Sequence, residues 1–408
     1  MVSEAMPASR TFSVGFFVDV GSRQESDPLH GASHFLEHVL FKGTARRAAE
    51  EISAELESVG GDLNAYTSKE HTCFHARVLG ADAERSVDVL TDMLTASRVR
   101  SADVEAERAV ILDEIAMHGD DPGETVQELV TGRLFGPSGL GRSVIGSEAS
   151  VAAMPRSAIV RHWRRHYRPD SLVVSAAGAV DHDGLLAQLD GLATEQAVPA
   201  ARRAPPTVLD YEGGLAAVVR PLEQCTVSMG VPGAGVFDDR RYPIGILTTI
   251  LGGGMASRLF VEVRERRGLA YGIDAADHSF TDAGLVSVDW QCSPENLVEI
   301  AGLVRAACED LAERGVTPAE MARAQGQMRG QTVLAYESPN SRMNRLGRNT
   351  LIGDDRSLEA VLDAFDAVTA EAVQAEAVRL FAQPVVLGVV GPRLAGAATR
   401  ALRGLVRP

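Results

Sequence analysis

The chain has 408 residues, 45% of them hydrophobic and 23% charged, with a formal net charge of −15 at pH 7. This length predicts two or more domains, because single hydrophobic cores stop growing at roughly 250–300 residues. The acidic balance disfavours nucleic acid as a partner, because phosphate binding needs clustered lysine and arginine. No stretch reaches the roughly 18 apolar residues of a membrane span, no secretory signal opens the chain, and the four cysteines are scattered. We therefore expect a cytoplasmic protein without a membrane partner.

A strand and then a helix with one polar face are predicted near the start of the chain. Residues 9–22 alternate apolar and polar side chains, as a half-buried strand does. The segment HGASHFLEHVLFKGT, residues 30–44, favours a helix on which His34, Glu37 and His38 share a face. Two histidines at this spacing can bind one zinc ion, and the order His-x-x-Glu-His is that of inverted zinc peptidases. These residues alone leave a metal site and a set of polar groups at the edge of the core as equal alternatives.

A later helix, predicted within residues 102–119, is the best source of a third metal ligand. Glu107 and Glu114 lie seven residues apart and share one face, while Val110, Ile111 and Ile115 provide an apolar side. A catalytic zinc takes three protein ligands and leaves one position for water. Taken alone, however, this segment fits a surface helix with solvated acidic residues better.

The two halves of the chain resemble each other. LGRSVIGSEASVAAM from Leu140 is similar to LGRNTLIGDDRSLEAV from Leu346, and the segment from Asp62 is similar to the one from Gly268, both about 205 residues apart. We expect homologous domains at 1–198 and 215–408, joined by a linker rich in Pro, Ala and Gly at 199–214. Strands and helices do not alternate regularly, so we expect an α+β fold, each domain a mostly antiparallel sheet with helices on one face.

Nearly the whole chain resembles the pitrilysin/insulinase-like zinc peptidases, and most closely the branch of mitochondrial processing peptidase and the bacterial peptidasomes. HFLEHVLFKGT is similar to the zinc-binding helix of that family. The resemblance implies that His34, His38 and Glu114 bind zinc, that Glu37 is the general base and that Glu107 supports a ligand histidine. Because the second half has no such residues at the corresponding positions, we expect one zinc ion per chain.

The resemblance also identifies residues that bind substrate. GGGMASRLFVEVRERRGLAYGI is similar to the family segment that supplies an Arg and a Tyr, here Arg264 and Tyr271. LNAYTSKEHTCF is similar to the edge strand that pairs with substrate, and the zinc helix ends in an aromatic residue that we also assign to substrate binding. The residues that this adds are Asn64, Ala65, Thr67 and Phe41.

The resemblance implies a zinc-dependent endopeptidase that cleaves short or unfolded peptides, basic ones if the net charge guides selection. In the family, two halves of this size close like a clamshell around a chamber. Arg264, Tyr271 and the zinc motif share one chain here, which favours a homodimer over a heterodimer with a related chain. The alternatives are a dedicated leader-peptide protease, a partner-dependent subunit and a non-catalytic scaffold. Family members begin earlier, so either the recorded start is late or the first sheet lacks an edge strand.

Overall fold

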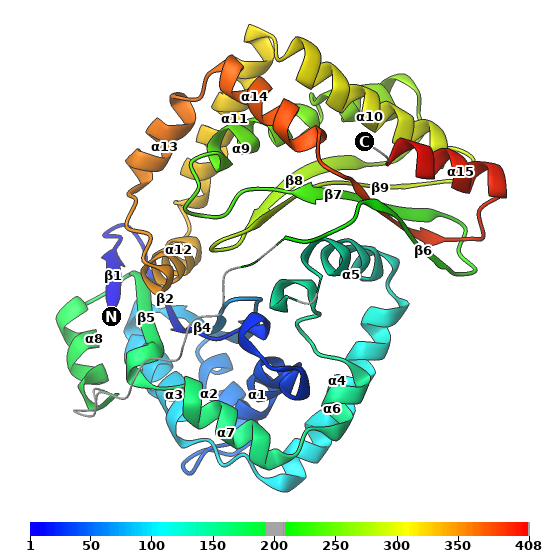
Figure 1. Cartoon of the computed structure of the whole chain (residues 1–408). Coiled ribbons are helices and arrows are strands. Elements are labelled where there is room, and N and C mark those ends of the chain that lie inside the picture. Colours follow the sequence, from blue (N-terminus) through cyan, green and yellow to red (C-terminus); the bar gives the residue numbers. More distant parts are fainter. Residues whose placement is uncertain (137, 193–206, 208, 407–408) are drawn as a thin grey trace. The chain divides into compact units, whose positions relative to one another are not determined.

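The computed structural model of the chain describes residues 1–136, 138–192, 207 and 209–406. The described backbone forms two compact units, and each unit is built on one five-stranded sheet (Figure 1). Both units take their residues from three separate parts of the chain. Unit 1 contains Met1–Ala116, Arg142–Pro205 and Val333–Asp355, and unit 2 contains Met117–Gly141, Pro206–Thr332 and Arg356–Pro408.

The sheet of unit 1 has the strand order β1-β5-β2-β4-β3, with β1 parallel to β5 and the other pairs antiparallel. Phe12, Val14 and Phe16 of β2 are buried on the face that packs against helices of the same unit. The elements are β1 (Val2–Ala5), β2 (Thr11–Val18), α1 (Ala32–Leu40), α2 (Ala49–Glu57), β3 (Asp62–Thr67), β4 (Thr72–Leu79), α3 (Ala83–Ala96), α4 (Ser101–Asp120), α6 (Glu148–Ala153), α7 (Arg156–His166), β5 (Leu172–Gly178) and α8 (His182–Leu189).

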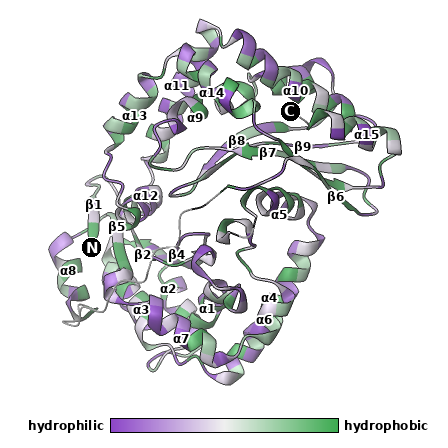
Figure 2. Cartoon of the chain, viewed as in Figure 1, coloured by the Kyte–Doolittle hydropathy of each residue, from purple (hydrophilic) through white to green (hydrophobic). Residues whose placement is uncertain are grey.

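The sheet of unit 2 repeats this order as β6-β10-β7-β9-β8, again with one parallel pair, β6 and β10. The central strands of both sheets are largely hydrophobic, whereas the edge strands β3 and β8 and the helices mix polar and apolar residues (Figure 2). The prediction of two homologous α+β domains is thereby confirmed. The elements are β6 (Gly214–Val219), β7 (Cys225–Pro232), α9 (Arg241–Leu251), the π-helix η7 (Phe260–Arg266), β8 (Ile273–Ser279), β9 (Gly284–Cys292), α10 (Leu297–Arg314), α11 (Pro318–Ala335), α13 (Leu358–Asp366), α14 (Ala370–Phe381), β10 (Val386–Gly391) and α15 (Gly396–Leu405).

The two units exchange one helix each. Helix α12 (Pro339–Ile352), from the second half of the chain, packs on β2 and β5 of unit 1, and α5 (Pro122–Phe135), from the first half, packs on β7 and β10 of unit 2. The contacts are close: a Cβ atom on Gly15 would lie 2.4 Å from the sulfur of Met343, and one on Gly230 would lie 2.5 Å from Val130. Each exchanged helix therefore covers the second face of a sheet, which sequence reasoning did not include.

The exchange changes how the sequence repeat is interpreted. The pair of segments from Asp62 and Gly268 marks equivalent strands, β3–β4 and β8–β9. The other pair begins in different elements, since Leu140 lies in a short 3-10 helix (Gly139–Gly141) and Leu346 lies within α12, but both segments run into helices, α6 and α13, that precede the central strands β5 and β10. The compact units differ from contiguous divisions at 1–198 and 215–408 in the placement of α5 and α12. Most of the predicted linker, 199–206 and 208, lies outside the described residues.

Two further expectations concern the ends of the sheet and the membrane. β1 takes the same edge position in unit 1 that β6 takes in unit 2, so the first sheet does not lack this strand. Among the described residues, every helix is too short or too polar to cross a bilayer.

Candidate metal centre

Helices α1 and α4 bring three ligand side chains together. His34 and His38 lie one turn apart on α1, and Glu114 lies on α4. The Nε2 atoms of His34 and His38 are 3.6 Å and 3.5 Å from the Oε2 atom of Glu114. A tetrahedral zinc with bonds of about 2.0–2.1 Å separates its ligand atoms by roughly 3.4 Å. The donor types and their spacing therefore fit zinc, and within the described residues these three form the one group of His, Cys, Asp or Glu with such proximity.

The apolar residues of α1 explain why its histidines point in a fixed direction. Phe35, Leu36, Val39 and Leu40 are fully buried in the core of unit 1, which leaves the opposite side of the helix for the polar residues. His34 is itself only 7% exposed. A buried imidazole without a partner would cost several kcal/mol, so the position is favourable only because a ligand group faces it.

Glu107 supports His38 from α4. Its Oε2 atom lies 3.0 Å from Nδ1 of His38, and because a carboxylate can only accept, the imidazole donates from Nδ1 and keeps Nε2 for a ligand bond. Lys42, which sequence reasoning missed, places Nζ 2.6 Å from Oε1 of the same carboxylate. Glu107 is 4% exposed, so the alternative of a solvated surface helix is wrong for this side of α4. Burial lowers the pKa of His38, but Glu114 and Glu107 outweigh it and raise the pKa overall.

Glu37 lies beside the ligands and is held by a residue of the edge strand. The hydroxyl of Thr67 donates a hydrogen bond of 2.5 Å to Oε2 of Glu37, which leaves Oε1 without this restraint. Burial raises the pKa of Glu37, while the bond from Thr67 lowers it and the charge of Glu114 raises it further. A carboxyl group with a raised pKa next to a metal site is suited to taking and returning a proton.

The predicted substrate-binding strand is an edge strand. β3 pairs only with β4 in the sheet, and it carries Asn64, Ala65 and Thr67. The backbone N–H of Ala65 donates to the Oδ1 atom of Asn64 at 2.8 Å, a bond that an added strand would replace. Tyr66 points the other way and donates its hydroxyl proton to Asn344 of α12 at 3.1 Å, which ties β3 to the exchanged helix. Phe41 is half-buried with its ring centroid 6.1 Å from that of Phe74.

Arg264 and Tyr271 lie together in unit 2. The Arg264 guanidinium carbon is 5.0 Å from the centre of the Tyr271 ring and 4.7 Å from that of Phe260. The Tyr271 side chain is 88% exposed. This pair belongs to unit 2, and the three metal ligands belong to unit 1.

A hollow of about 540 Å³ begins beside Tyr271, between α5 and the sheet of unit 2. Two paired strand residues, Asp274 and Asp289, line it. Asp289 accepts a hydrogen bond of 2.7 Å from Gln127 of α5 and one of 2.6 Å from Ser287. Burial raises the pKa of Asp274, and the charge of Asp289 raises it further. The hollow was not expected from the sequence.

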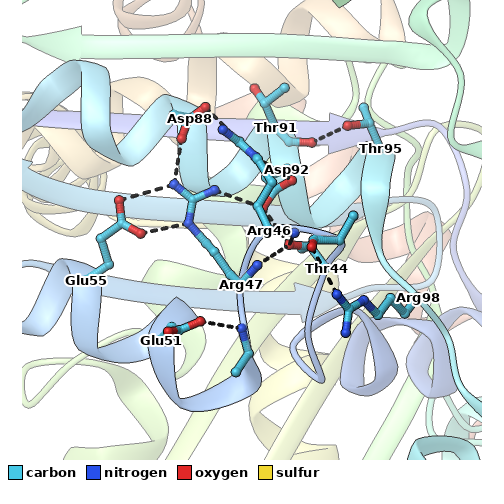
Figure 3. A network of polar contacts seen from close by, with 12 residues as sticks. Thr44, Arg46, Arg47, Glu51, Glu55, Asp88, Thr91, Asp92, Thr95 and Arg98 are labelled. Carbon is cyan, nitrogen blue, oxygen red and sulfur yellow. Dashed lines mark hydrogen bonds and ion pairs between the residues drawn. The ribbon is translucent and has the colours of Figure 1, made fainter.

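The loop after the zinc helix is fixed by a half-buried arginine. Arg47 contacts Glu55 of α2 at 2.7 Å and both Asp88 and Asp92 of α3, at 2.5 Å and 2.8 Å (Figure 3). Thr44 donates a hydrogen bond of 2.6 Å to Asp92. These contacts anchor the C-terminal end of α1 to two neighbouring helices. No sequence motif indicated these contacts, apart from the adjacent arginines at 46 and 47.

The sequence is similar to those of known proteins. Residues 1–148 match the family described as Insulinase (Peptidase family M16), and residues 154–328 match the Peptidase M16 inactive domain. An uncharacterized zinc protease of Streptomyces coelicolor is 42% identical over 400 residues, covering 96% of this chain and 87% of that protein. An uncharacterized zinc protease of Mycobacterium tuberculosis is also 42% identical, covering 96% of this chain and 91% of that protein. YmxG of Bacillus subtilis, another uncharacterized zinc protease, is 31% identical, with 96% of each chain covered.

Solved structures share the fold. A peptidase M16 inactive domain from Pseudomonas fluorescens superposes with a TM-score of 0.87 at 19% identity, covering 97% of this chain and 95% of that one. A protease from Helicobacter pylori gives a TM-score of 0.87 at 18% identity, covering 96% of each chain. At these identities the likeness concerns the fold alone.

Proposed function

Because the chain belongs to the insulinase-like peptidase family M16, we propose that it is a zinc-dependent endopeptidase that cleaves short or unfolded peptides. The observation that carries this proposal is the arrangement of His34, His38 and Glu114 within 4.8 Å of one another, with Glu37 beside them. A non-catalytic scaffold would not need a complete ligand set together with a half-buried carboxyl group. The relatives named above as zinc proteases support the same reading.

The protein residues have distinct tasks in the reaction. Zinc bound by His34, His38 and Glu114 would lower the pKa of a coordinated water and polarise the scissile carbonyl. Glu37 takes the proton of the attacking water on Oε1, the oxygen that Thr67 does not hold, and later returns it to the leaving amine. Glu107 keeps His38 in the tautomer that presents Nε2 to the metal.

The peptide is proposed to bind as an added strand on β3. An edge strand offers unpaired backbone groups, so main-chain hydrogen bonds supply affinity for any extended peptide. Asn64 would rotate away and release the N–H of Ala65. Thr67 links this strand to the general base, so a peptide paired with β3 lies next to Glu37. Arg264 and Tyr271 are proposed to hold the substrate from unit 2.

Basic peptides are the proposed preference. The chain carries a net charge of −15, and Asp274 and Asp289 line the hollow beside Tyr271. We expect matched peptides to be cleaved faster when basic than when acidic, with the difference shrinking as salt is added. The variant Asp274→Asn should reduce the difference. Equal cleavage of both peptides at low salt would argue against this preference.

A homodimer is the proposed assembly, with peptide enclosed in a chamber and each site completed by Arg264 and Tyr271 of the partner. The support is that one chain contains both the zinc motif and the Arg264–Tyr271 pair. Twofold homodimers are also the commonest oligomers. Light scattering of the purified protein would report the molecular mass, and a monomer that cleaves peptide would contradict the proposal.

The proposed activity is tested with a quenched-fluorescent basic peptide and the purified protein alone. We expect cleavage as isolated, loss with a chelator, recovery with zinc, and no cleavage by Glu37→Gln in any condition. Chelation and recovery together would establish metal dependence, and Glu37→Gln separates chemistry from metal binding because it should still bind zinc. Zinc bound without cleavage would indicate a missing partner chain or a dedicated leader peptide, and absence of zinc binding would refute the metal site.

A further inference from the structure

Glu25 holds the start of the zinc helix. Its side chain is buried, with 5% of the residue exposed, and each carboxylate oxygen accepts one backbone hydrogen bond. Oε2 accepts from Gly31 at 2.7 Å and Oε1 from Ser33 at 2.6 Å. Gly31 is the residue that precedes α1, and without a side chain it cannot cap the helix itself. The N–H of the residue before α1 and one of the first free N–H groups of the helix, that of Ser33, are therefore satisfied by a carboxylate from an earlier segment.

Burial makes the anionic form of the Glu25 carboxylate costly in free energy. The nearby cation Arg142 donates to Asp27 at 2.7 Å and to the backbone oxygen of Glu25 at 2.6 Å, rather than to the carboxylate. His162, which contacts Ser33 at 3.1 Å, is neutral because burial lowers its pKa to about 3. Burial raises the pKa of Glu25 to about 7, against the hydrogen bonds from Ser33 and Gly31 and the charge of Arg142. A neutral cap would be less costly, so the charge calls for an explanation.

The zinc site supplies that explanation. His34 is the third residue of α1, so a metal bound to it lies next to the helix N-terminus. A helix N-terminus carries about half a positive charge, which opposes a divalent cation in its first turn. A carboxylate bound to the N–H groups of that turn reverses the sign of the local field. Its bond to Ser33 also fixes the backbone directly before His34.

We propose that Glu25 is a positioning residue of the metal centre, which raises zinc affinity by placing a negative charge at the N-terminus of the zinc helix. This inference rests on the zinc site proposed above. It predicts that the charge of Glu25, more than its hydrogen bonds, determines the affinity. It also predicts that the benefit appears only when metal is bound, because in the metal-free protein the buried charge is a cost.

The experiment compares Glu25→Gln and Glu25→Asp with the wild type in zinc competition against a chromophoric chelator. We expect Glu25→Gln to lose about 10- to 100-fold in zinc affinity, the range for residues that support metal ligands. Glu25→Asp keeps the charge and should stay within about threefold. The thermal transition of metal-free Glu25→Gln should not fall below that of the wild type. Cobalt(II) spectra of the loaded proteins would report any change in ligand geometry.

A matched control is Glu376→Gln, which removes another carboxylate of 8% exposure, paired with Arg379 in unit 2. It should leave zinc affinity unchanged. If the wild type binds no zinc, the metal site itself fails. If the wild type binds zinc and folded Glu25→Gln binds it equally well, the role of Glu25 alone is overturned. If Glu25→Gln does not fold, the test rests on Glu25→Asp. A loss of zinc affinity of tenfold or more in Glu25→Asp, with an unchanged thermal transition of its metal-free form, would overturn the role of charge.

Discussion

Replacing Thr67 by Val should impair proteolysis more strongly at acid pH than at alkaline pH. The hydroxyl of Thr67 donates 2.5 Å to Oε2 of Glu37 and thereby favours the carboxylate, the form that accepts a proton from water. A hydrogen bond to a charged group contributes about 1.5–3 kcal/mol, so its loss lowers the ionisation constant of Glu37 by roughly 10- to 150-fold. At pH values below the pKa, the fraction of Glu37 in the carboxylate form falls by the same factor. Because burial already raises the pKa of Glu37, removing the bond raises it further and extends protonation to higher pH.

The assay is the pH dependence of kcat/KM for one fluorogenic peptide between about pH 5 and 9 with zinc in excess. We expect the acid limb of the Thr67→Val profile to move to higher pH, with kcat/KM approaching the wild-type value on the alkaline side. Thr67→Ser keeps the hydroxyl and is the matched control, with a limb near that of the wild type. A uniform loss at every pH, or an equal displacement in Thr67→Ser, would refute the reasoning and assign Thr67 to peptide binding alone.

Three further outcomes are expected. Glu107→Gln should weaken zinc binding by about 10- to 100-fold in chelator competition, because a carboxamide holds His38 less firmly; unchanged affinity would contradict the support drawn from α4. Met343→Ala should cost about 2–5 kcal/mol in denaturant unfolding, since Met343 is fully buried, whereas Met255→Ala, at 77% exposure, should cost little. The Glu25 carboxyl should by itself lower the stability of the metal-free wild type by about 3 kcal/mol between pH 4.5 and 7, because the folded state binds its proton more tightly than the unfolded chain does, and this contribution should be the difference between the pH profiles of the wild type and Glu25→Gln.

The part of the site that is local in sequence could be predicted from it. His34, Glu37 and His38 follow from helix spacing, since residues three and four apart share a face. Glu114 lies 76 positions beyond His38, and only the family resemblance selected it from a helix that would otherwise have been assigned to the surface. Once both helices are placed, the three ligand atoms lie within 4.8 Å of one another, which spacing alone does not determine.

Sequence reasoning missed the contacts that the site and the sheets make with residues from other elements. Lys42 lies in the turn after α1, and its role requires knowing that Glu107 contacts both Lys42 and His38. Glu25 precedes the helix by seven residues in a segment without regular periodicity, and its two backbone bonds are not encoded in any motif. The exchange of α5 and α12 was also missed, because the apolar pattern of a helix shows which side is buried and not which sheet buries it.

The exchanged helices impose an order on synthesis. The sheet beside the zinc helix receives α12 only after residues 339–352 have been made, about 300 residues after α1. At roughly 5–20 residues per second, the ribosome needs about 15–60 s for that interval. From the completion of β5 at residue 178 until then, one face of the sheet, including Phe17 and Ala177, has no helix to cover it. A nascent chain therefore contains its metal ligands long before unit 1 can complete its fold. Unit 1 is complete only when α12, which is synthesised in the last third of translation, packs on its sheet.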